Sequence, residues 1–261
     1  MKIILIGSGN VAYNMANLFA QNNITVTQVI SRNAITGKHV ATICGATYNN
    51  TITTIPGNTT VIVITTQDAN IKSVVDTLPT TNAVIIHTSG TTPINAVANK
   101  SPNYGILYPL QSLMYGVNKI PEIAFLVQAS NISTSNLLLK FASTLGCKAT
   151  VANPKQMQHI HIAAVIVNNF TNHLYTLAYH YCLSNHISFD VLLALVHHTA
   201  NRLTKGINPV TLQTGPAIRN DNVTIQTHQA LLASNLPLLQ LYNAFTESIK
   251  NEVLLREKPN I

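Results

Sequence analysis

The residues with the clearest chemical meaning lie at the start of the chain, where an apolar strand runs directly into a glycine-rich turn. Residues 2–6 are KIILI and residues 7–12 are GSGNVA. In such a turn Gly7 permits a tight exit from the strand, Gly9 lets backbone N–H groups approach a pyrophosphate, and Ala12 allows the following helix to pack closely. The phosphates would bind at the helix N-terminus, so the pattern predicts a dinucleotide site, with a purely structural turn as the alternative. The expected contacts are Gly7, Ser8, Gly9, Asn10 and Val11.

The second predicted strand, residues 25–30, bears on the choice of dinucleotide. A site for NAD usually places Asp or Glu at the end of this strand, about 20 residues beyond the glycine turn, to bind the ribose 2′-hydroxyl. Here the strand ends in Ser31 and Arg32, and the first acidic residue of the chain is Asp68. An Arg guanidinium can bind a 2′-phosphate as a planar fork. We therefore expect NADP rather than NAD or FAD, with Ser31 and Arg32 as contacts; the alternative for Arg32 is a solvated loop cation.

Two further predicted strands, residues 60–65 and 82–87, flank a helix over residues 69–78 and end in polar clusters. Ligands of open parallel sheets bind beyond the carboxyl ends of the strands. Asp68 could border the cofactor or serve as the N-cap of the next helix, and His87 could do the same or be a satisfied imidazole at a strand end. The remaining residues expected to border the cofactor are Thr65, Thr66, Thr88 and Ser89.

A long helix is predicted over residues 155–184, and it carries a polar seam. At a spacing of 3.6 residues one side of this helix is apolar, while a narrow stripe on the other side is polar but uncharged. A mere solvent-facing surface is one explanation of the stripe. The helix is nevertheless too apolar to be mostly exposed, which favours a functional seam. The stripe consists of His161, Asn168, Asn172 and Tyr179.

The composition indicates a globular chain of about two domains, with 261 residues of which 46% are hydrophobic and 9% charged. The net charge of +7 comes from basic residues scattered without a Lys/Arg run, so nucleic-acid binding is not expected. Cys44, Cys147 and Cys182 lack metal-ligand spacing and suggest free thiols in a reducing compartment. With no leader pattern and with Asn and His breaking the apolar helix, we expect a cytoplasmic protein without a membrane span or a metal site.

The order of predicted elements gives the fold class. Strands and helices alternate up to residue 152, as expected for an α/β domain with a doubly wound parallel sheet. The later strands are expected at 104–108, 123–129 and 147–152, and a helix at 133–145 is expected to end at Gly146. Everything after Pro154 is predicted helical, with Asp221 as a helix N-cap. We therefore expect a Rossmann domain over residues 1–152 and an all-helical domain over residues 153–261.

Several motifs spread over nearly the whole chain point to one family. They are GSGNVA at 7–12, Ser31-Arg32, HTSG at 87–90, PLQ at 109–111, HIAA at 161–164 with NNF at 168–170, and TGP at 214–216 with Arg219 and Asp221. In these motifs the chain resembles the Rossmann-like proteins carrying the domain of unknown function DUF2520, relatives of the F420-dependent NADP oxidoreductase and pyrroline-5-carboxylate reductase group. The resemblance implies a Rossmann domain followed by a helical domain similar to the C-terminal one of 6-phosphogluconate dehydrogenase.

The sequence departs from its relatives at positions that concern catalysis. Family members tend to have His-Pro-Leu where this chain has Tyr108-Pro109-Leu110, and Asn220 replaces a usual Gly. In β-hydroxyacid dehydrogenases the corresponding helix holds a catalytic Lys one turn before an Asn; if Asn168 matches that Asn, Val165 occupies the Lys position. His161 is then the nearby group able to transfer a proton near neutral pH. We expect His161 as general acid with Asn168 beside it, or else a structural role for His161.

Two classes of function follow from these residues. The leading hypothesis is an NADPH-dependent reductase of a small C=O or C=N substrate bound between the two domains. Its rival is a non-catalytic NADP-binding or sensing protein, and an F420 cofactor is a third possibility inherited from the wider group. A homodimer built on the helical domain is expected, because apolar residues near the C-terminus exceed what one small bundle encloses. These residues are Leu231, Leu232, Leu236, Leu238, Leu239 and Leu241.

Overall fold

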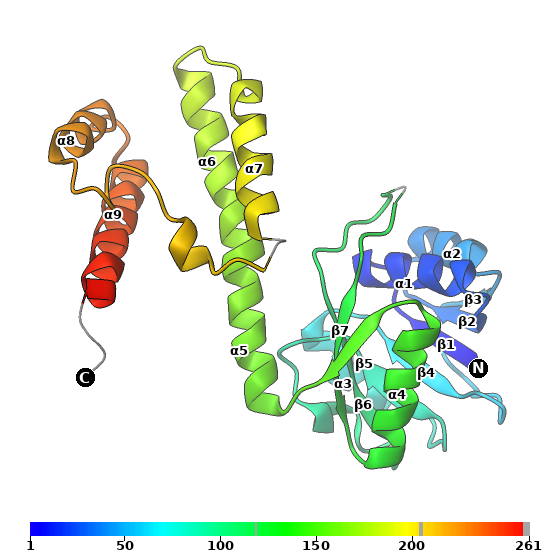
Figure 1. Cartoon of the computed structure of the whole chain (residues 1–261). Coiled ribbons are helices and arrows are strands. Elements are labelled where there is room, and N and C mark those ends of the chain that lie inside the picture. Colours follow the sequence, from blue (N-terminus) through cyan, green and yellow to red (C-terminus); the bar gives the residue numbers. More distant parts are fainter. Residues whose placement is uncertain (118, 204–205, 258–261) are drawn as a thin grey trace. The chain divides into compact units, whose positions relative to one another are not determined.

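The computed structural model describes residues 1–117, 119–203 and 206–257. It divides into two compact units, Met1–Phe170 and Thr171–Ile261 (Figure 1). The first unit holds a mostly parallel sheet with helices on both faces, and the described regular elements of the second are all helices.

The sheet of the first unit has eight strands in the order β3-β2-β1-β4-β5-β6-β7-β8. Neighbouring strands are parallel except for β6 and β7, which pair antiparallel. The predicted doubly wound sheet is therefore confirmed, with one correction: β7 runs antiparallel to β6, and the described residues between these two strands form no crossover helix. The strands are β1 (Lys2–Ile6), β2 (Thr25–Ile30), β3 (Thr47–Asn49), β4 (Val61–Ile64), β5 (Val84–His87), β6 (Tyr104–Leu110), β7 (Ala124–Ala129) and β8 (Lys148–Val151).

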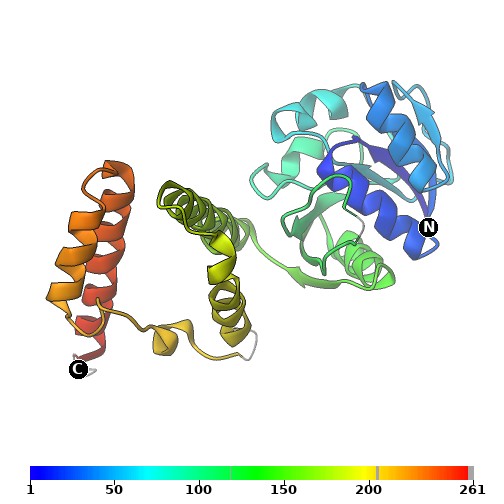
Figure 2. The same cartoon turned by 90° about the horizontal axis from the view of Figure 1, so that it is seen from above.

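The central strands β1, β4 and β5 are buried on both faces of the sheet, since nearly all of their residues are buried and successive side chains of a strand point to opposite faces. On one face Ile3 and Leu5 pack with helices α1 (Asn10–Gln21), α2 (Ala34–Ile43) and α4 (Ile132–Thr144). On the other face Ile4 and Ile6 pack with α3 and η2. Figure 2 shows α1 and α4 on one side of the sheet and α3 on the other. The bounds of the elements on this second face are η1 (Asp68–Asn70), α3 (Ile71–Asp76) and η2 (Ile94–Val97).

The long helix predicted over residues 155–184 consists of three successive segments. They are α5 (Pro154–Ala164), a π-helical segment η3 (Val165–Phe170) and α6 (Thr171–Ser184). Because π-helical hydrogen bonds span one residue more than those of an α-helix, residues beyond Ala164 are rotated from the positions that a 3.6-residue period assigns. The predicted polar stripe from His161 to Tyr179 assumed one uninterrupted α-helix, whereas the structure has a π-helical segment between α5 and α6.

The start of α5 belongs to the first unit. Met157 is buried with Ile106, Leu126 and Ala152, and Ile160 packs against the same cluster. A capping box of Asn153 and Gln156 fixes the beginning of the helix, with Pro154 in its first turn. The compact unit thus extends to Phe170, while the change from strands to helices falls near residue 152, as the sequence pattern predicts.

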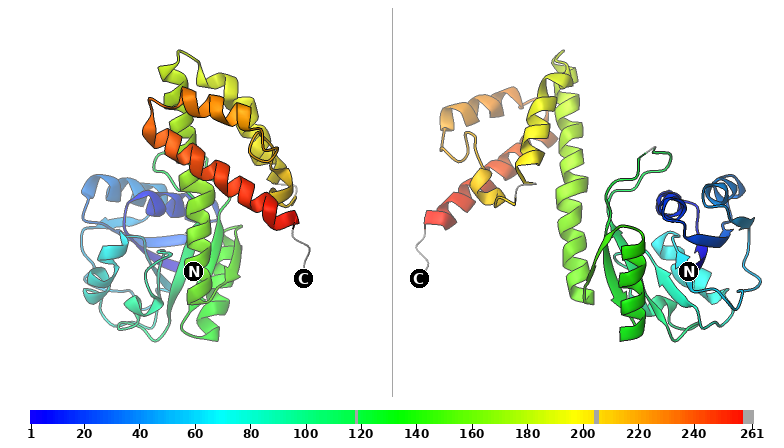
Figure 3. Two further views of the ribbon diagram at one scale, coloured as in Figure 1. Left: turned by 90° about the vertical axis from the view of Figure 1, so that its left-hand side faces the viewer. Right: turned by 45° about the vertical axis from the view of Figure 1, so that its right-hand side comes forward.

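The second unit continues with short helices and ends in a helical pair. Asp221 caps α8 by accepting hydrogen bonds from the Thr224 N–H at 3.1 Å and the Thr224 hydroxyl at 2.7 Å, which confirms the predicted N-cap. Helices α8 and α9 lie side by side (Figure 3), and His228 Nδ1 is 2.9 Å from the Tyr242 hydroxyl between them. No helix among the described residues is both long and apolar enough to cross a membrane. The remaining elements are η4 (Phe189–Leu192), α7 (Leu193–Leu203), η5 (Pro209–Leu212), α8 (Asn222–Leu231) and α9 (Leu236–Glu257).

Candidate functional site

A groove of about 970 Å³ lies at the carboxyl ends of β1, β2 and β4. It is lined by most of the residues predicted to contact a dinucleotide, whereas Thr88 and Ser89 are not among its lining residues. The structure also adds lining residues that the sequence patterns did not indicate, from the segments that follow β2, β3 and β4 and from α3. The predicted residues in the lining are Gly7, Ser8, Gly9, Asn10, Val11, Ser31, Arg32, Thr65, Thr66 and Gln67, which belongs to the polar cluster after β4; the added ones include Asn33, Asn50, Thr51, Ile52, Asn70, Ser73, Val74 and Thr77.

The glycine turn has the geometry of an anion site. Gly7 has φ of +123°, and a Cβ there would lie 2.4 Å from Thr65 Oγ1, so both the backbone and the packing require glycine. Gly9 is the N-cap of α1 and makes no side-chain capping bond, while a Cβ on it would meet no atom within 4 Å. No side chain caps the first N–H groups of α1, and Gly9, Asn10 and Val11 line the groove, so a phosphate bound there can accept hydrogen bonds from these groups.

At the end of β2 a set of hydroxyl groups stands beside a single cation. The Ser8 hydroxyl is 2.7 Å from the hydroxyls of both Ser31 and Thr36, and the Tyr48 hydroxyl donates to the Ser31 carbonyl at 2.9 Å. Arg32 is exposed and makes no hydrogen bond or ion pair within the described part of the chain. The groove lining contains Arg32 but no carboxylate, so its electrostatics favour an anionic ligand.

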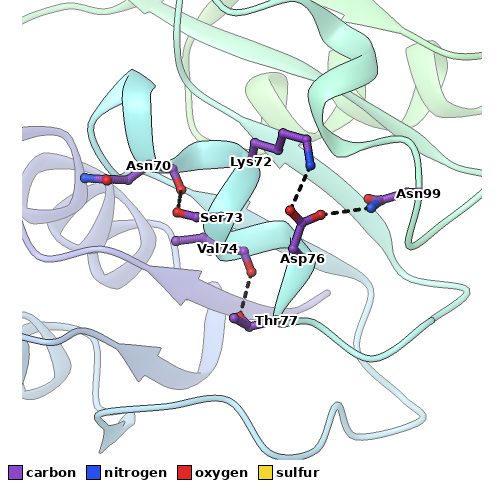
Figure 4. Close-up of polar contacts among 7 residues, drawn as sticks. All are labelled: Asn70, Lys72, Ser73, Val74, Asp76, Thr77 and Asn99. Atoms are coloured by element: carbon purple, nitrogen blue, oxygen red, sulfur yellow. Dashed lines mark hydrogen bonds and ion pairs between the residues drawn. The ribbon is translucent and has the colours of Figure 1, made fainter.

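Helix α3 closes another side of the groove with neutral groups, shown in Figure 4. The Ser73 hydroxyl donates to the Asn70 carbonyl at 2.9 Å, as the Thr77 hydroxyl does to Val74 at 2.7 Å. Asp76 is bound instead by Lys72 at 2.8 Å and by Asn99 at 3.1 Å. The hydrogen bond from Lys72, followed by that from Asn99, holds the pKa of the Asp76 carboxyl below its usual value. The negative charge of α3 is thus paired by Lys72 and Asn99, which do not line the groove.

The polar groups that line the groove are suited to binding a dinucleotide. Besides the uncapped α1 N-terminus, the Thr66 hydroxyl is buried without a hydrogen-bond partner, and Thr66 lines the groove. A buried polar atom left unpaired is costly, so a ligand that bonds with it would remove that cost. The residues present therefore fit an anionic dinucleotide such as NADP.

A second polar cluster follows β4 and β5. Asp68 Oδ2 accepts hydrogen bonds from the hydroxyls of Ser89 and Thr91, both at 2.7 Å. Asp68 is not an N-cap, because Gln67 holds that position before η1 and Asn70 before α3. Ser89, predicted to border the cofactor, thus lies outside the groove and binds Asp68. Thr88, predicted likewise, is buried there and donates to the Ile64 carbonyl at 3.4 Å.

His87 belongs to the same region but is enclosed in the sheet. Its side chain is 0% exposed, its Nδ1 accepts a hydrogen bond from the Ser89 N–H at 3.2 Å, and its Nε2 has no hydrogen-bond partner. Burial lowers the pKa of His87 to about 4, so the imidazole is neutral at physiological pH. It is therefore a structural imidazole with one unsatisfied nitrogen.

The structure brings together Tyr108 and His161, which the sequence patterns singled out separately. The Tyr108 hydroxyl on β6 is 3.0 Å from His161 Nδ1 on α5. The Tyr108 ring also packs over Gly90, where a Cβ would lie 2.9 Å from Tyr108 Cζ. Burial, followed by the negative charge of Asp68, raises the pKa of the Tyr108 hydroxyl. The pair joins a phenol and an imidazole, two groups whose chemistry suits proton transfer, near the carboxyl end of β6.

Asn168, predicted to act beside His161, is placed differently. It lies in the π-helical segment, is exposed, and makes no hydrogen bond among the described residues. The structure therefore does not bring it to the Tyr108–His161 pair. Among the residues described, no group of three or more His, Cys, Asp or Glu side chains could hold a metal ion.

The fold and groove define the class of this protein: a Rossmann-type α/β protein with a dinucleotide groove, followed by helices. A family model for the domain of unknown function DUF2520 matches residues 123–249. A crystal structure described as a candidate NADP oxidoreductase from Bacteroides fragilis is 31% identical, with a TM-score of 0.85 over 96% of this chain and 98% of the other. The chain belongs to the Rossmann-like proteins that carry the DUF2520 domain.

More distant structures share the fold. A protein from Thermotoga maritima is 19% identical with a TM-score of 0.80, covering 96% of this chain and 99% of its own. An imine reductase from Myxococcus stipitatus in complex with NADP⁺ is 15% identical with a TM-score of 0.66, covering 98% of this chain and 95% of its own. Among curated proteins, none matches this sequence significantly.

Proposed function

We propose that this protein is an NADPH-dependent oxidoreductase that reduces a small C=O or C=N compound. The observation that carries the proposal is the groove, which joins an uncapped helix N-terminus, an unpaired Arg32 and a lining without carboxylates. The similarity to an NADP oxidoreductase candidate at 31% identity supports the cofactor. The similarity to an imine reductase supports a C=N substrate as one option.

Each predicted residue has a place in this proposal. Arg32 and Ser31 bind the 2′-phosphate, and the α1 N-terminus binds the pyrophosphate. Thr65 and Thr66 border the next part of the cofactor, toward Thr88 and Ser89 at the end of β5. Bound NADPH supplies the hydride. His161 takes part in delivering the proton, and Asn168 is retained as a catalytic candidate in the π-helical segment.

A binding or sensing role without turnover is the second candidate. Val165 stands in η3, where a related dehydrogenase mechanism would need a lysine, and this observation favours the second candidate. A screen of NADPH oxidation over keto acids, imines and opine-type precursors separates the two. Turnover with any compound supports the reductase, and His161→Ala or Asn168→Ala should then lower it by roughly 10²-fold or more. Tight NADPH binding with no turnover over the whole panel would favour the sensor.

Cofactor preference can be measured without a substrate. NADPH should bind at least about tenfold more tightly than NADH, a difference of about 1.4 kcal/mol, because Arg32 meets the 2′-phosphate. Arg32→Ala should weaken NADPH and leave NADH unchanged in calorimetric titrations. Lys38→Ala is the matched control, since Lys38 is an exposed cation of α2 that does not line the groove. Equal affinities for the two cofactors in the wild type would remove the role given to Arg32.

We also place the protein in the cytoplasm. The free thiols of Cys44, Cys147 and Cys182 suit a reducing compartment. Burial raises the pKa of the Cys44 thiol to about 11, so this thiol is a poor nucleophile at neutral pH. The cysteines therefore have no part in the proposed chemistry.

A further inference from the structure

The Tyr108–His161 pair and the groove both lie at the carboxyl edge of the sheet. Ile64 of β4 pairs with His87 of β5, and His87 pairs with Ile106 of β6. Tyr108 thus extends two residues beyond the end of β5, at the carboxyl edge where Thr65 borders the groove. Neighbouring strands are about 4.8 Å apart, which puts β6 about 10 Å from β4. A substrate next to the reactive end of a cofactor in the groove would lie within reach of Tyr108.

We propose that the Tyr108 hydroxyl, and not the His161 imidazole, gives the proton to the substrate, while His161 restores that proton. This inference rests on the proposed reductase function and assigns its proton donor. Tyr108 is then a catalytic residue, and His161 is a positioning and relay residue. Gly90 is needed because a larger side chain there would collide with the Tyr108 ring.

The contacts explain why the phenol is the better donor. His161 Nδ1 is occupied by Tyr108 at 3.0 Å, so this nitrogen is not free for a substrate. The charged or titratable groups that act on Tyr108 are His161 from α5 and Asp68 from η1. Because burial and the Asp68 charge disfavour the phenolate, Tyr108 keeps its proton until a stronger base forms beside it. That base is the oxygen or nitrogen of the substrate as hydride reaches its carbon.

The step is balanced in atoms and charge. Hydride from NADPH forms the new C–H bond, and the electron pair of the C=O or C=N π bond moves to the heteroatom. The Tyr108 O–H bond breaks as its proton forms an O–H or N–H bond on that heteroatom. The resulting phenolate takes the proton of His161 Nδ1, and water replaces that proton on the imidazole and leaves hydroxide in the solvent. The products are the alcohol or amine and NADP⁺.

A substrate that needs no proton provides the decisive test. Dihydroisoquinoline, assayed at alkaline pH where it is largely neutral, requires hydride and a proton, whereas its N-methyl iminium ion requires hydride alone. Tyr108→Phe should lower kcat on the imine about 10²-fold, the usual contribution of a general acid, and leave the iminium ion nearly unaffected. His161→Gln, which keeps a hydrogen-bond donor but cannot relay the proton, should give a smaller loss on the imine only. Tyr104→Phe, the same change at another position of β6, should alter neither.

Each outcome separates the inference from the proposed function. Equal turnover of both compounds by wild type and Tyr108→Phe, or equal loss on both, would overturn the donor role while the reductase function stands. If the wild type reduces only carbonyl compounds of the wider panel, its kcat should fall at alkaline pH as Tyr108 ionises, and Tyr108→Phe should lack this fall. An unchanged pH profile in that variant would equally overturn the inference. Absence of turnover with every compound would overturn the proposed function itself, and the donor role with it.

Discussion

The sheet region of the first unit and the helices that follow it differ in how much of their apolar surface is buried. The largest fully buried side chains, such as Phe19, Phe125 and Phe141, all belong to the sheet or to the helices packed on it. Beyond Met157 the buried apolar residues of the described part of the chain are few, namely Cys182, Ala217, Ile225 and Leu232. The exposed large hydrophobic residues have the opposite distribution, because most of them lie after Val151.

This difference assigns different tasks to the two regions. Both faces of the sheet are covered by the chain's own helices, so its carboxyl edge is a rigid frame on which the groove and Tyr108 can be held. The later helices leave apolar side chains in water, and large apolar surface of this kind usually meets a partner. The groove and Tyr108 belong to the closed region, and we propose that assembly depends on the open one.

The largest predicted effect tests whether the sheet region is closed. Phe141 is fully buried and stacks on Phe19 with ring centroids 5.8 Å apart, so Phe141→Ala should cost about 3–5 kcal/mol of unfolding free energy. Phe245 in α9 is 49% exposed, and Phe245→Ala should cost about 0.5 kcal/mol or less. Denaturant unfolding of both variants at low protein concentration checks the pair. Similar costs would abolish the distinction between the regions.

The next effect concerns pH and the same sheet. His87 has an ordinary pKa of 6.5 when unfolded and about 4 when folded, because burial disfavours its charged form. The unfolded chain therefore binds more protons between these values, and stability present above pH 6.5 is lost as the pH falls toward 4. The full loss attributable to His87 is about 3 kcal/mol. His87→Asn, whose amide oxygen can accept the Ser89 N–H, should flatten this dependence in unfolding measurements at two pH values; an unchanged slope would contradict it.

Much of the sheet could be predicted from sequence, because its strands are apolar and its turns use glycine. Strand β2 falls at the expected residues, and Gly146, with φ of +69°, ends α4 as expected. The helix α2 gave no clear signal, since Gly37 stands in its middle, where glycine weakens a helix. The reason is tertiary: a Cβ on Gly37 would lie 2.5 Å from the Tyr48 ring. Such a packing requirement is invisible in a local pattern.

Local sequence patterns likewise reveal some residues of the candidate site and miss those that only tertiary packing brings together. The glycine turn and Arg32 could be found because the spacing between strand, turn and strand end is itself the signal. The pairing of Tyr108 with His161 joins residues 53 positions apart. It depends on the docking of α5 through Met157 against β6 and β7. The groove residues of α3 could not be found either, because a short helix with Ser73 and Thr77 has no motif that distinguishes lining from surface.

The smallest predicted effect concerns the open region, where we propose a homodimer built on residues after about 152. Val167 in η3 is 72% exposed, so Val167→Asp should be harmless in an isolated chain but should raise the dimer dissociation constant at least about tenfold, or about 1.4 kcal/mol, if a second copy covers it. Ile132→Asp is the control, because Ile132 is 81% exposed on α4 of the sheet region. In a two-fold symmetric dimer the interface would contain η3 of both copies, so each dimer would carry the substitution twice. Light scattering across micromolar concentrations decides: a wild-type monomer, or a dimer weakened only by Ile132→Asp, would show that the exposed apolar helices are not where the copies meet.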